Sequence, residues 1–374
     1  MVLVVVAALV ALGANRVFGR ADPVLGTADA PILLAWTSDD LLPELADASR
    51  EAEGIGAVAE ARNGVGWLTS WGAEGAPAEA PPSGFEIPVE ILAVDPEDYS
   101  EFIPRGDRSE FEDLAEGAAL LGETGAGFRG IESEGTLRLE GASIPVTGVV
   151  PDALVSNHEV VVSNSTAAAL GIDDLRYVLL ELERGTSTEE AEQELRSLLP
   201  RGSRLHLRGP ADADTFRPGG TILSQAEIKK IFGEFAARPG RGRNIQIDPE
   251  WIEQNTANIT IPRLGSSRCH TEVIPQIQDA FREVSERGLN SLIRQGDFGG
   301  CFAPRLLNSD PNSGISHHSW GIAFDFNVSR NPYGAEPTMD RRLVDVLEEW
   351  GFAWGGDWTV PDGMHFEYLR EPDT

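Results

Sequence analysis

One short segment, residues 316–327 (SHHSWGIAFDFN), constrains the fold of this chain more than any other. Apolar side chains at 322, 324 and 326 alternate with small or polar ones at 323, 325 and 327, the period-two pattern of a β-strand. The Asp325 carboxylate therefore points away from the phenylalanines and toward a cleft. His318 lies in the turn before the strand, where its side chain can reach back toward the Asp325 carboxylate.

A second block, residues 355–368 (GGDWTVPDGMHFEY), follows about forty residues later. We expect GMHFEY to form a short strand that presents His365, with Asp362 in the turn before it. A zinc site for hydrolysis needs three nitrogen or oxygen ligands, an open position for water and a carboxylate base nearby. His318, Asp325 and His365 supply the ligands, and Asp362 supplies the base.

Two neighbouring side chains have more than one interpretation. Glu367 follows His365 by two residues and shares its face of the strand, so we interpret it as a partner that orients an imidazole. The alternative is that Glu367 replaces Asp362 as the base. His317 faces the other way in a strand-like backbone, and we interpret it as a supporting or solvent-facing residue rather than as a ligand.

Residues 248–370 resemble the zinc D-Ala-D-Ala carboxypeptidase family, which includes VanY-type carboxypeptidases, VanX-type dipeptidases and phage L-alanyl-D-glutamate endopeptidases. The resemblance rests on both blocks and on CHTEVIPQIQDAF (269–281) and GGCFAPR (299–305). It implies one catalytic Zn²⁺ on His318, Asp325 and His365, with Asp362 as the base. An aspartate in the D-x-x-H position is similar to the endopeptidase branch, whereas VanX-type enzymes have glutamate.

The resemblance also assigns two residues to the substrate. Arg305 matches the arginine that the family places before its first histidine. It would either hydrogen-bond the scissile carbonyl oxygen or clamp a substrate carboxylate, with a surface salt bridge as the alternative. Ser316 begins the motif and is expected to bond substrate or an adjacent loop.

The implied function is hydrolysis of amide bonds in peptidoglycan stem peptides, of the D-Ala-D-Ala carboxypeptidase or the L-Ala-D-Glu endopeptidase type. Loops such as 328–340 would decide between them. The implied fold is α+β, a hedgehog-like zinc domain with a small antiparallel sheet and flanking helices. One alternative is a non-catalytic peptidoglycan-binding or sensory module that retains the zinc site. In another, the N-terminal domain is a subunit partner for an export complex, with the peptidase as cargo.

More than half of the chain precedes this domain. We expect a separate α+β domain over 28–208, a linker over 209–247 that contains a helix at 225–235, and the zinc domain over 248–374. Within the first domain we expect strands at 31–36, 64–69, 89–95, 136–139, 144–150, 160–163 and 177–182, and helices at 96–102, 109–120, 165–170 and 187–198.

The 28–208 region resembles the extracytoplasmic domain of MacB/FtsX-type transporter permeases. The resemblance rests on AVDPEDYSEFIP (93–104), LLGETGAGFRGI (120–131) and TLRLEGASIPVTGVVPDALV (136–155). Further hydrophobic runs of bilayer length are missing from the sequence, so transport is not implied. An envelope protein is a candidate partner for this domain.

The beginning of the sequence and the cysteines bear on location. Residues 2–14 (VLVVVAALVALGA) are apolar throughout but shorter than the ~20 residues that cross a bilayer. We interpret 1–20 as a membrane anchor or a signal segment, with a buried element of a cytosolic protein as the alternative. Cys269 and Cys301 are outside any CxxC pair, so they form either a disulfide suited to an oxidising compartment or two reduced buried thiols. The expected location is extracytoplasmic, anchored to the membrane or secreted.

The charge excludes one class of partner. Acidic residues outnumber basic ones 60 to 30, which gives a net charge of −30, and Lys229 and Lys230 are the only lysines. Such a surface repels phosphate backbones, so nucleic-acid binding is not expected. The acidity is otherwise a source of solubility and says little about substrate.

Overall fold

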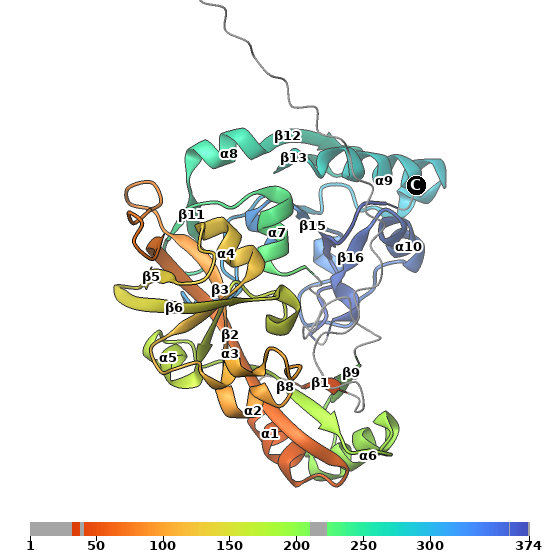
Figure 1. Cartoon of the computed structure of the whole chain (residues 1–374). Helices are drawn as coiled ribbons and strands as arrows, with labels where there is room; N and C mark the ends of the chain where they lie inside the picture. Colours follow the sequence, from red (N-terminus) through yellow and green to blue (C-terminus); the bar gives the residue numbers. More distant parts are fainter. Residues whose placement is uncertain (1–31, 38–40, 210–222, 359, 373–374) are drawn as a thin grey trace, which may run out of the picture.

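A computed structural model of the chain describes residues 32–37, 41–209, 223–358 and 360–372 (Figure 1). The expected anchor or signal segment, residues 1–20, lies outside these ranges. In the described ranges, no helix combines the length and the apolar composition that spanning a bilayer requires.

The N-terminal region is built on a nine-stranded mixed sheet with the strand order β3-β7-β4-β6-β5-β2-β8-β1-β9. Its strands are β1 (Ile32–Trp36), β2 (Ile55–Ala73), β3 (Ile87–Val94), β4 (Ala119–Gly122), β5 (Gly135–Leu139), β6 (Ala142–Val150), β7 (Val160–Ser163), β8 (Leu175–Leu182) and β9 (His206–Arg208). Its helices are α1 (Leu42–Glu51), α2 (Pro96–Ser100), α3 (Arg108–Glu112), α4 (Glu123–Arg129), α5 (Asn164–Ala169) and α6 (Thr188–Leu198).

Strand β2 holds this region together. Residues 55–62 pair with β8, residues 61–68 with β3, and residues 68–73 with β5. The sequence predicts a strand only at 64–69, within a strand that spans 19 residues. Two apolar cores form on the sheet, one around α1, α2 and β8 and the other around β3, β5 and β6.

The helix expected at 109–120 is wrong in extent. Helix α3 begins at Arg108 and ends at Glu112. Residues 119–122 form β4 instead, which is buried along its whole length and pairs with β6 and β7. Ladder hydrogen bonds and burial of these apolar residues outweigh the local helical pattern.

The C-terminal region contains a four-stranded antiparallel sheet of order β14-β15-β17-β16 and two small ribbons, β10-β11 and β12-β13. Its strands are β10 (Ala237–Pro239), β11 (Ile245–Ile247), β12 (Thr256–Ile261), β13 (Gly265–His270), β14 (Phe298–Gly300), β15 (Ala323–Phe326), β16 (Phe352–Trp354) and β17 (His365–Tyr368). Its helices are α7 (Gln225–Phe232), α8 (Pro249–Asn255), α9 (Ile274–Glu286) and α10 (Arg341–Glu349).

One face of the small sheet is packed with aromatic side chains. Phe281 of α9 lies edge-on to Phe324 and Phe326, with ring centroids 5.8 and 5.7 Å apart. Phe366 stacks on Phe326 from the neighbouring strand at 5.3 Å. The structure thus confirms a mixed α and β fold with a small antiparallel sheet and flanking helices, and it leaves the opposite face of the sheet for polar residues.

The segment expected as a linker contains α7, which touches both regions (Figure 1). Lys229 is fully buried and donates to the Pro88 carbonyl at 2.6 Å and to the Glu159 carboxylate at 2.8 Å, both in the N-terminal region. Phe232 and Phe235 belong to the C-terminal core. The helix ends at Phe232, short of the expected 235, where Gly233 adopts a φ of 85°.

A loop of the C-terminal region also binds the N-terminal sheet. The Val65 amide donates to the Asn312 carbonyl at 2.7 Å, and Trp67 Nε1 donates to the Pro311 carbonyl at 2.9 Å. Asn312 Nδ2 in turn donates to the Leu170 carbonyl at 2.6 Å. This loop leads directly into the turn that carries His318.

A buried ion network joins α7 to the N-terminal region. Glu234 accepts from Arg129 at 2.6 and 2.7 Å and lies 2.9 Å from Lys229 Nζ. Burial by itself would raise the pKa of Glu234, but the charges of Lys229 and Arg129 lower this pKa from 4.5 to about 2. The ionised carboxylate therefore stabilises the fold above pH 4.5, and this contribution is lost as the pH falls toward 2.

We predict that the free energy of unfolding of the wild type falls by on the order of 2 kcal/mol more than that of Glu234→Gln between pH 6 and pH 3, because the variant has no carboxylate to protonate. Urea unfolding at both pH values measures this difference. The exposed Glu286→Gln should behave as the wild type. Equal losses in the wild type and Glu234→Gln would contradict the prediction.

Candidate metal centre

Three side chains converge on one point beside the small sheet. Asp325 Oδ1 lies 3.2 Å from His318 Nε2 and 3.0 Å from His365 Nδ1, and these two nitrogens are 3.2 Å apart. Ligand atoms on a tetrahedral zinc ion at about 2.0–2.1 Å are about 3.3–3.4 Å apart. The spacing of the three atoms therefore suits a small tetrahedral cation.

Pairing between two strands positions two of these three side chains, Asp325 and His365. β15 and β17 are antiparallel neighbours, and Asp325 lies directly opposite His365. Directly opposed residues point to the same face of a sheet, as Phe324 and Phe366 do one position along on the core side. The alternation along residues 322–327 thus produces an aromatic face and a polar face.

His318 comes from a short 3-10 turn, His317–Ser319, that precedes β15. The turn closes at Gly321, with a φ of 73°, where a Cβ atom would lie 2.9 Å from the His270 amide nitrogen. Glycine therefore suits this position both sterically and conformationally. The His318 carbonyl accepts from the Ala303 amide at 3.0 Å, which fixes the turn to the segment after β14.

In both His318 and His365, the ring nitrogen that does not face the cluster has a hydrogen-bond partner. His318 Nδ1 lies 2.7 Å from the Cys301 carbonyl, which can only accept, so Nδ1 carries the hydrogen. His365 Nε2 lies 3.2 Å from Glu367 Oε2 and donates to that carboxylate. In neutral rings, His318 Nε2 and His365 Nδ1 then present lone pairs to each other and to Asp325. Three lone pairs aimed at one point are stabilised by a cation, so the donor set fits a metal ion.

Glu367 also contacts His317. Glu367 is buried, and its Oε2 lies 2.9 Å from His317 Nδ1. The three converging ligand atoms do not include His317, which is itself buried rather than solvent-facing. The sequence gives little sign of this contact, because it joins residues fifty positions apart.

The electrostatics favour positive charge at this point. Burial alone would raise the pKa of Asp325, but the adjacent His318 and His365, when protonated, hold this pKa well below its usual range. Burial would lower the pKa of His365, yet Asp325 and Glu367 raise it to about 10. Burial lowers the pKa of His318. Burial would raise the pKa of Glu367, whereas His317 and His365 lower it to about 2.

Asp362 lies in the turn before β17, where its carbonyl accepts from the His365 amide at 3.0 Å. Burial raises the pKa of its carboxyl, partly opposed by the nearby His365. Its buried Oδ1 has no hydrogen-bond partner among the described residues. A buried acceptor without a partner is costly, and a water held beside it would satisfy this oxygen.

Arg305 is half-buried close to the carboxylates of Asp325 and Asp362, and burial lowers the pKa of its guanidinium. Within the described ranges the guanidinium forms no ion pair closer than 4 Å, and its Nη1 makes one long hydrogen bond of 3.4 Å to the Ala303 carbonyl. Its backbone is held by Ser319, whose hydroxyl accepts from the Arg305 amide at 3.0 Å and donates to the Arg305 carbonyl at 3.1 Å.

Ser316 is buried at the start of the His318 turn, and its amide donates to the Arg305 carbonyl at 3.0 Å. It thereby links the Arg305 segment to the turn. Ser319 and the Cys301 carbonyl support the site in a similar way, and no sequence motif marks either of them.

The expected pairing of the cysteines is present. Cys269 and Cys301 form a disulfide, both residues are fully buried, and their Cα atoms are 5.2 Å apart. The alternative of two reduced thiols is not what the structure contains.

Comparison with known proteins finds a similarity for part of the C-terminal region. Residues 309–368 match the family model of D-alanyl-D-alanine carboxypeptidase. The matched stretch contains His318, Asp325, Asp362 and His365 and leaves Arg305 and the disulfide outside. No curated protein matches the chain in sequence.

Solved structures are similar to the N-terminal region, as expected from its sequence. The periplasmic region of MacB from Actinobacillus actinomycetemcomitans has a TM-score of 0.36 and 12% identity, covering 50% of this chain and 91% of that chain. The extracellular domain of the noncanonic ABC-type transporter YknZ from Gram-positive bacteria has a TM-score of 0.30 and 14% identity, covering 48% and 98%.

We predict that Glu367→Gln weakens zinc binding about 10- to 100-fold, because the neutral amide supports the His365 ring less well than a carboxylate. Competition with a chromogenic chelator measures the affinity. The exposed Glu371→Gln, four residues along the chain, should bind zinc as the wild type does. An unchanged affinity in Glu367→Gln would show that this carboxylate does not support His365.

Proposed function

We propose that the C-terminal region is a zinc peptidase that hydrolyses amide bonds in peptidoglycan stem peptides. The observation that carries the proposal is the convergence of His318 Nε2, Asp325 Oδ1 and His365 Nδ1 beside Asp362, whose buried Oδ1 has no partner in the described part of the chain. The family match over residues 309–368 supports the reaction class.

The residues divide into separate tasks. His318, Asp325 and His365 would hold the ion, and Glu367 would orient the His365 ring through its outer nitrogen. A bound zinc ion supplies Lewis acidity and lowers the pKa of a water molecule toward ~7. Asp362 accepts the proton of the attacking water and returns it to the leaving amine, a task that its raised pKa favours.

Arg305 is the group suited to the substrate carbonyl. It is charged and half-buried near Asp325 and Asp362, and its guanidinium is free of ion pairs within the described ranges. A guanidinium in such a place can donate to the carbonyl oxygen as negative charge develops or bind a carboxylate of the peptide. Ser316, one residue before the turn, would contact substrate or keep the Arg305 segment in place.

We further propose that the protein acts outside the cytoplasm. The buried disulfide is of the kind that persists in oxidising compartments, where peptidoglycan lies. The N-terminal region would then serve as a docking domain for another envelope protein, and residues 1–20 would anchor or export the chain.

The bond that is cut is testable with defined muropeptides. We expect release of D-alanine if the enzyme is a D,D-carboxypeptidase, and cleavage between L-alanine and D-glutamate if it is an endopeptidase. Mass spectrometry of the products distinguishes the two, and a chelator should abolish either activity. No product from any stem peptide, with zinc bound, would instead support a non-catalytic wall-binding or sensory module.

The division of tasks gives a prediction for two variants. Asp362→Ala should keep its zinc and lose about 10²- to 10⁴-fold in kcat, because it lacks only the proton acceptor. His318→Ala should lose the metal itself. Metal analysis after dialysis and muropeptide kinetics measure the two effects, with the exposed Asp357→Ala as the matched control. An Asp362→Ala protein without zinc would contradict the assignment of this residue as the base.

A further inference from the structure

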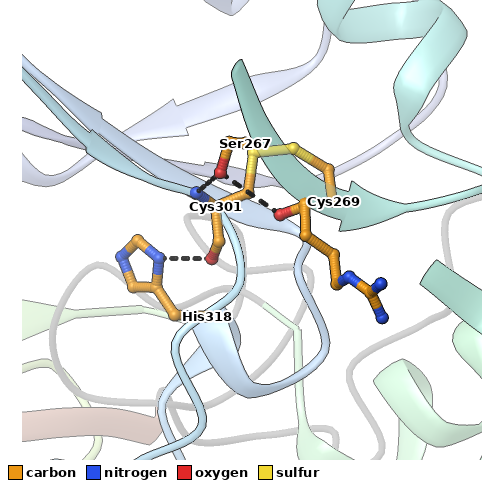
Figure 2. The surroundings of a disulfide bond; sticks show 5 residues. Ser267, Cys269, Cys301 and His318 are labelled. Carbon is orange, nitrogen blue, oxygen red and sulfur yellow. Dashed lines mark hydrogen bonds between the residues drawn. A yellow bond between two sulfur atoms is a disulfide. The ribbon is translucent and has the colours of Figure 1, made fainter. Parts of the chain in front are cut away.

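The disulfide lies next to the candidate metal centre rather than at a remote place in the fold (Figure 2). It connects Cys269 in β13 to Cys301, the residue after β14. Neither side chain is exposed to solvent. Both segments that it joins contact the turn carrying His318.

Cys301 touches His318 through its backbone. The Cys301 carbonyl accepts the Nδ1 hydrogen of His318 at 2.7 Å, as Figure 2 shows. This bond selects the tautomer in which Nε2 presents its lone pair to Asp325 and His365. The position of one carbonyl therefore sets both the tautomer and the ring orientation of a metal ligand.

The Cys301 peptide is held almost entirely by β13. The Cys301 amide donates to Ser267 Oγ at 2.9 Å, and the Phe302 amide donates to the Arg268 carbonyl at 3.0 Å. The disulfide to Cys269 is the third link and the only covalent one. β13 and β14 belong to different sheets, so a regular ladder of hydrogen bonds does not connect them.

Cys269 fixes the other side of the same turn. The next amide, that of His270, donates to the Gly321 carbonyl at 2.9 Å. Gly321 closes the His318 turn against the Cys269 backbone, where a Cβ atom would lie 3.2 Å from the Cys269 carbonyl carbon. The disulfide thus joins the two segments between which the turn is held.

We propose that the Cys269–Cys301 disulfide is a positioning device for the metal ligand His318, so that zinc affinity depends on the redox state of the protein. This inference rests on the zinc site proposed above. A dithiol or phosphine reductant supplies two electrons, which together with two protons convert the S–S bond into two thiols, and the reductant is oxidised. The Cys301 carbonyl then loses its covalent tether, and the His318 ring loses its fixed orientation.

The consequence is a peptidase that binds zinc weakly in a reducing compartment and tightly in an oxidising one. An enzyme that cuts amide bonds would thereby gain its metal only after its disulfide has formed. A disulfide that only stabilised the fold would raise the melting temperature without changing zinc affinity, and this difference makes the inference testable.

The test compares zinc affinities of the full chain by competition with a chromogenic chelator, at a temperature where every protein is folded by circular dichroism. The double variant Cys269→Ala/Cys301→Ala replaces chemical reduction, since dithiols themselves bind zinc. We expect its affinity to fall about 10- to 100-fold, the range typical for loss of a group that supports a metal ligand. Val284→Ala, a buried α9 residue of the same core, is the control for lost stability.

A spectroscopic readout addresses the ring directly. Nitrogen-15 NMR of the metal-free oxidised protein should show His318 protonated at Nδ1 alone, whereas the double variant should show a mixture of tautomers. Ser267→Ala keeps the disulfide and removes the hydrogen bond to the Cys301 amide, so it should weaken zinc binding several-fold. This variant serves as the test if the double variant does not fold.

The outcomes separate the two proposals. Oxidised wild type that fails to bind zinc would overturn the proposed function. Tight binding by the wild type with equal affinity in the double variant, or an equal loss in Val284→Ala, would overturn the positioning role. If the double variant does not fold, unchanged affinity in Ser267→Ala overturns it.

Discussion

The antiparallel pairing of β15 with β17 is the constraint on which the candidate site depends. It places Asp325 opposite His365 and, one position along, Phe324 opposite Phe366. Phe324 packs against Phe281 of α9, so the polar pair cannot shift without moving the core. A register change of one residue would exchange the two faces and bury the ligands among phenylalanines. The positions of the candidate metal ligands Asp325 and His365 therefore depend on the aromatic packing on the opposite face of the sheet.

Around Asp325 and His365, the site contains acidic side chains that each need a positive charge or a hydrogen-bond donor nearby. Asp325 and Glu367 are buried carboxylates on either side of the His365 ring, and Asp362 keeps an acceptor without a described partner. Burying several acids together is unfavourable unless cations or hydrogen bonds compensate them. The imidazoles and Arg305 supply part of that compensation, and a cation at the proposed metal site would supply more.

Sequence reasoning worked where the relevant information is local. The alternation at 322–327, the spacing of the two blocks and the helix that begins after Ser187 are each encoded within a dozen residues, and the structure has these elements. The predicted end of helix α3 and the predicted length of strand β2 were wrong, because pairing with distant strands decides where these elements end. Sequence reasoning did not find the Cys301 carbonyl, because every residue has a carbonyl and only the tertiary fold distinguishes this one. The environment of His317 is set by Glu367 of β17, which the sequence around His317 does not reveal.

Helix α7 has a consequence for how such a protein can evolve. Phe232 and Phe235 fill the C-terminal core, and the carbonyls of Phe232 and Gly233 bond to the His270 and Trp320 rings of that region. The same helix carries Lys229, a fully buried cation whose carboxylate partner Glu159 belongs to the other half. A gene fusion that transferred the C-terminal half with its helix would break the contacts of Lys229 with Glu159 and of Glu234 with Arg129. A new neighbour would have to supply both an acid and a base at the same positions to keep Lys229 and Glu234 compensated.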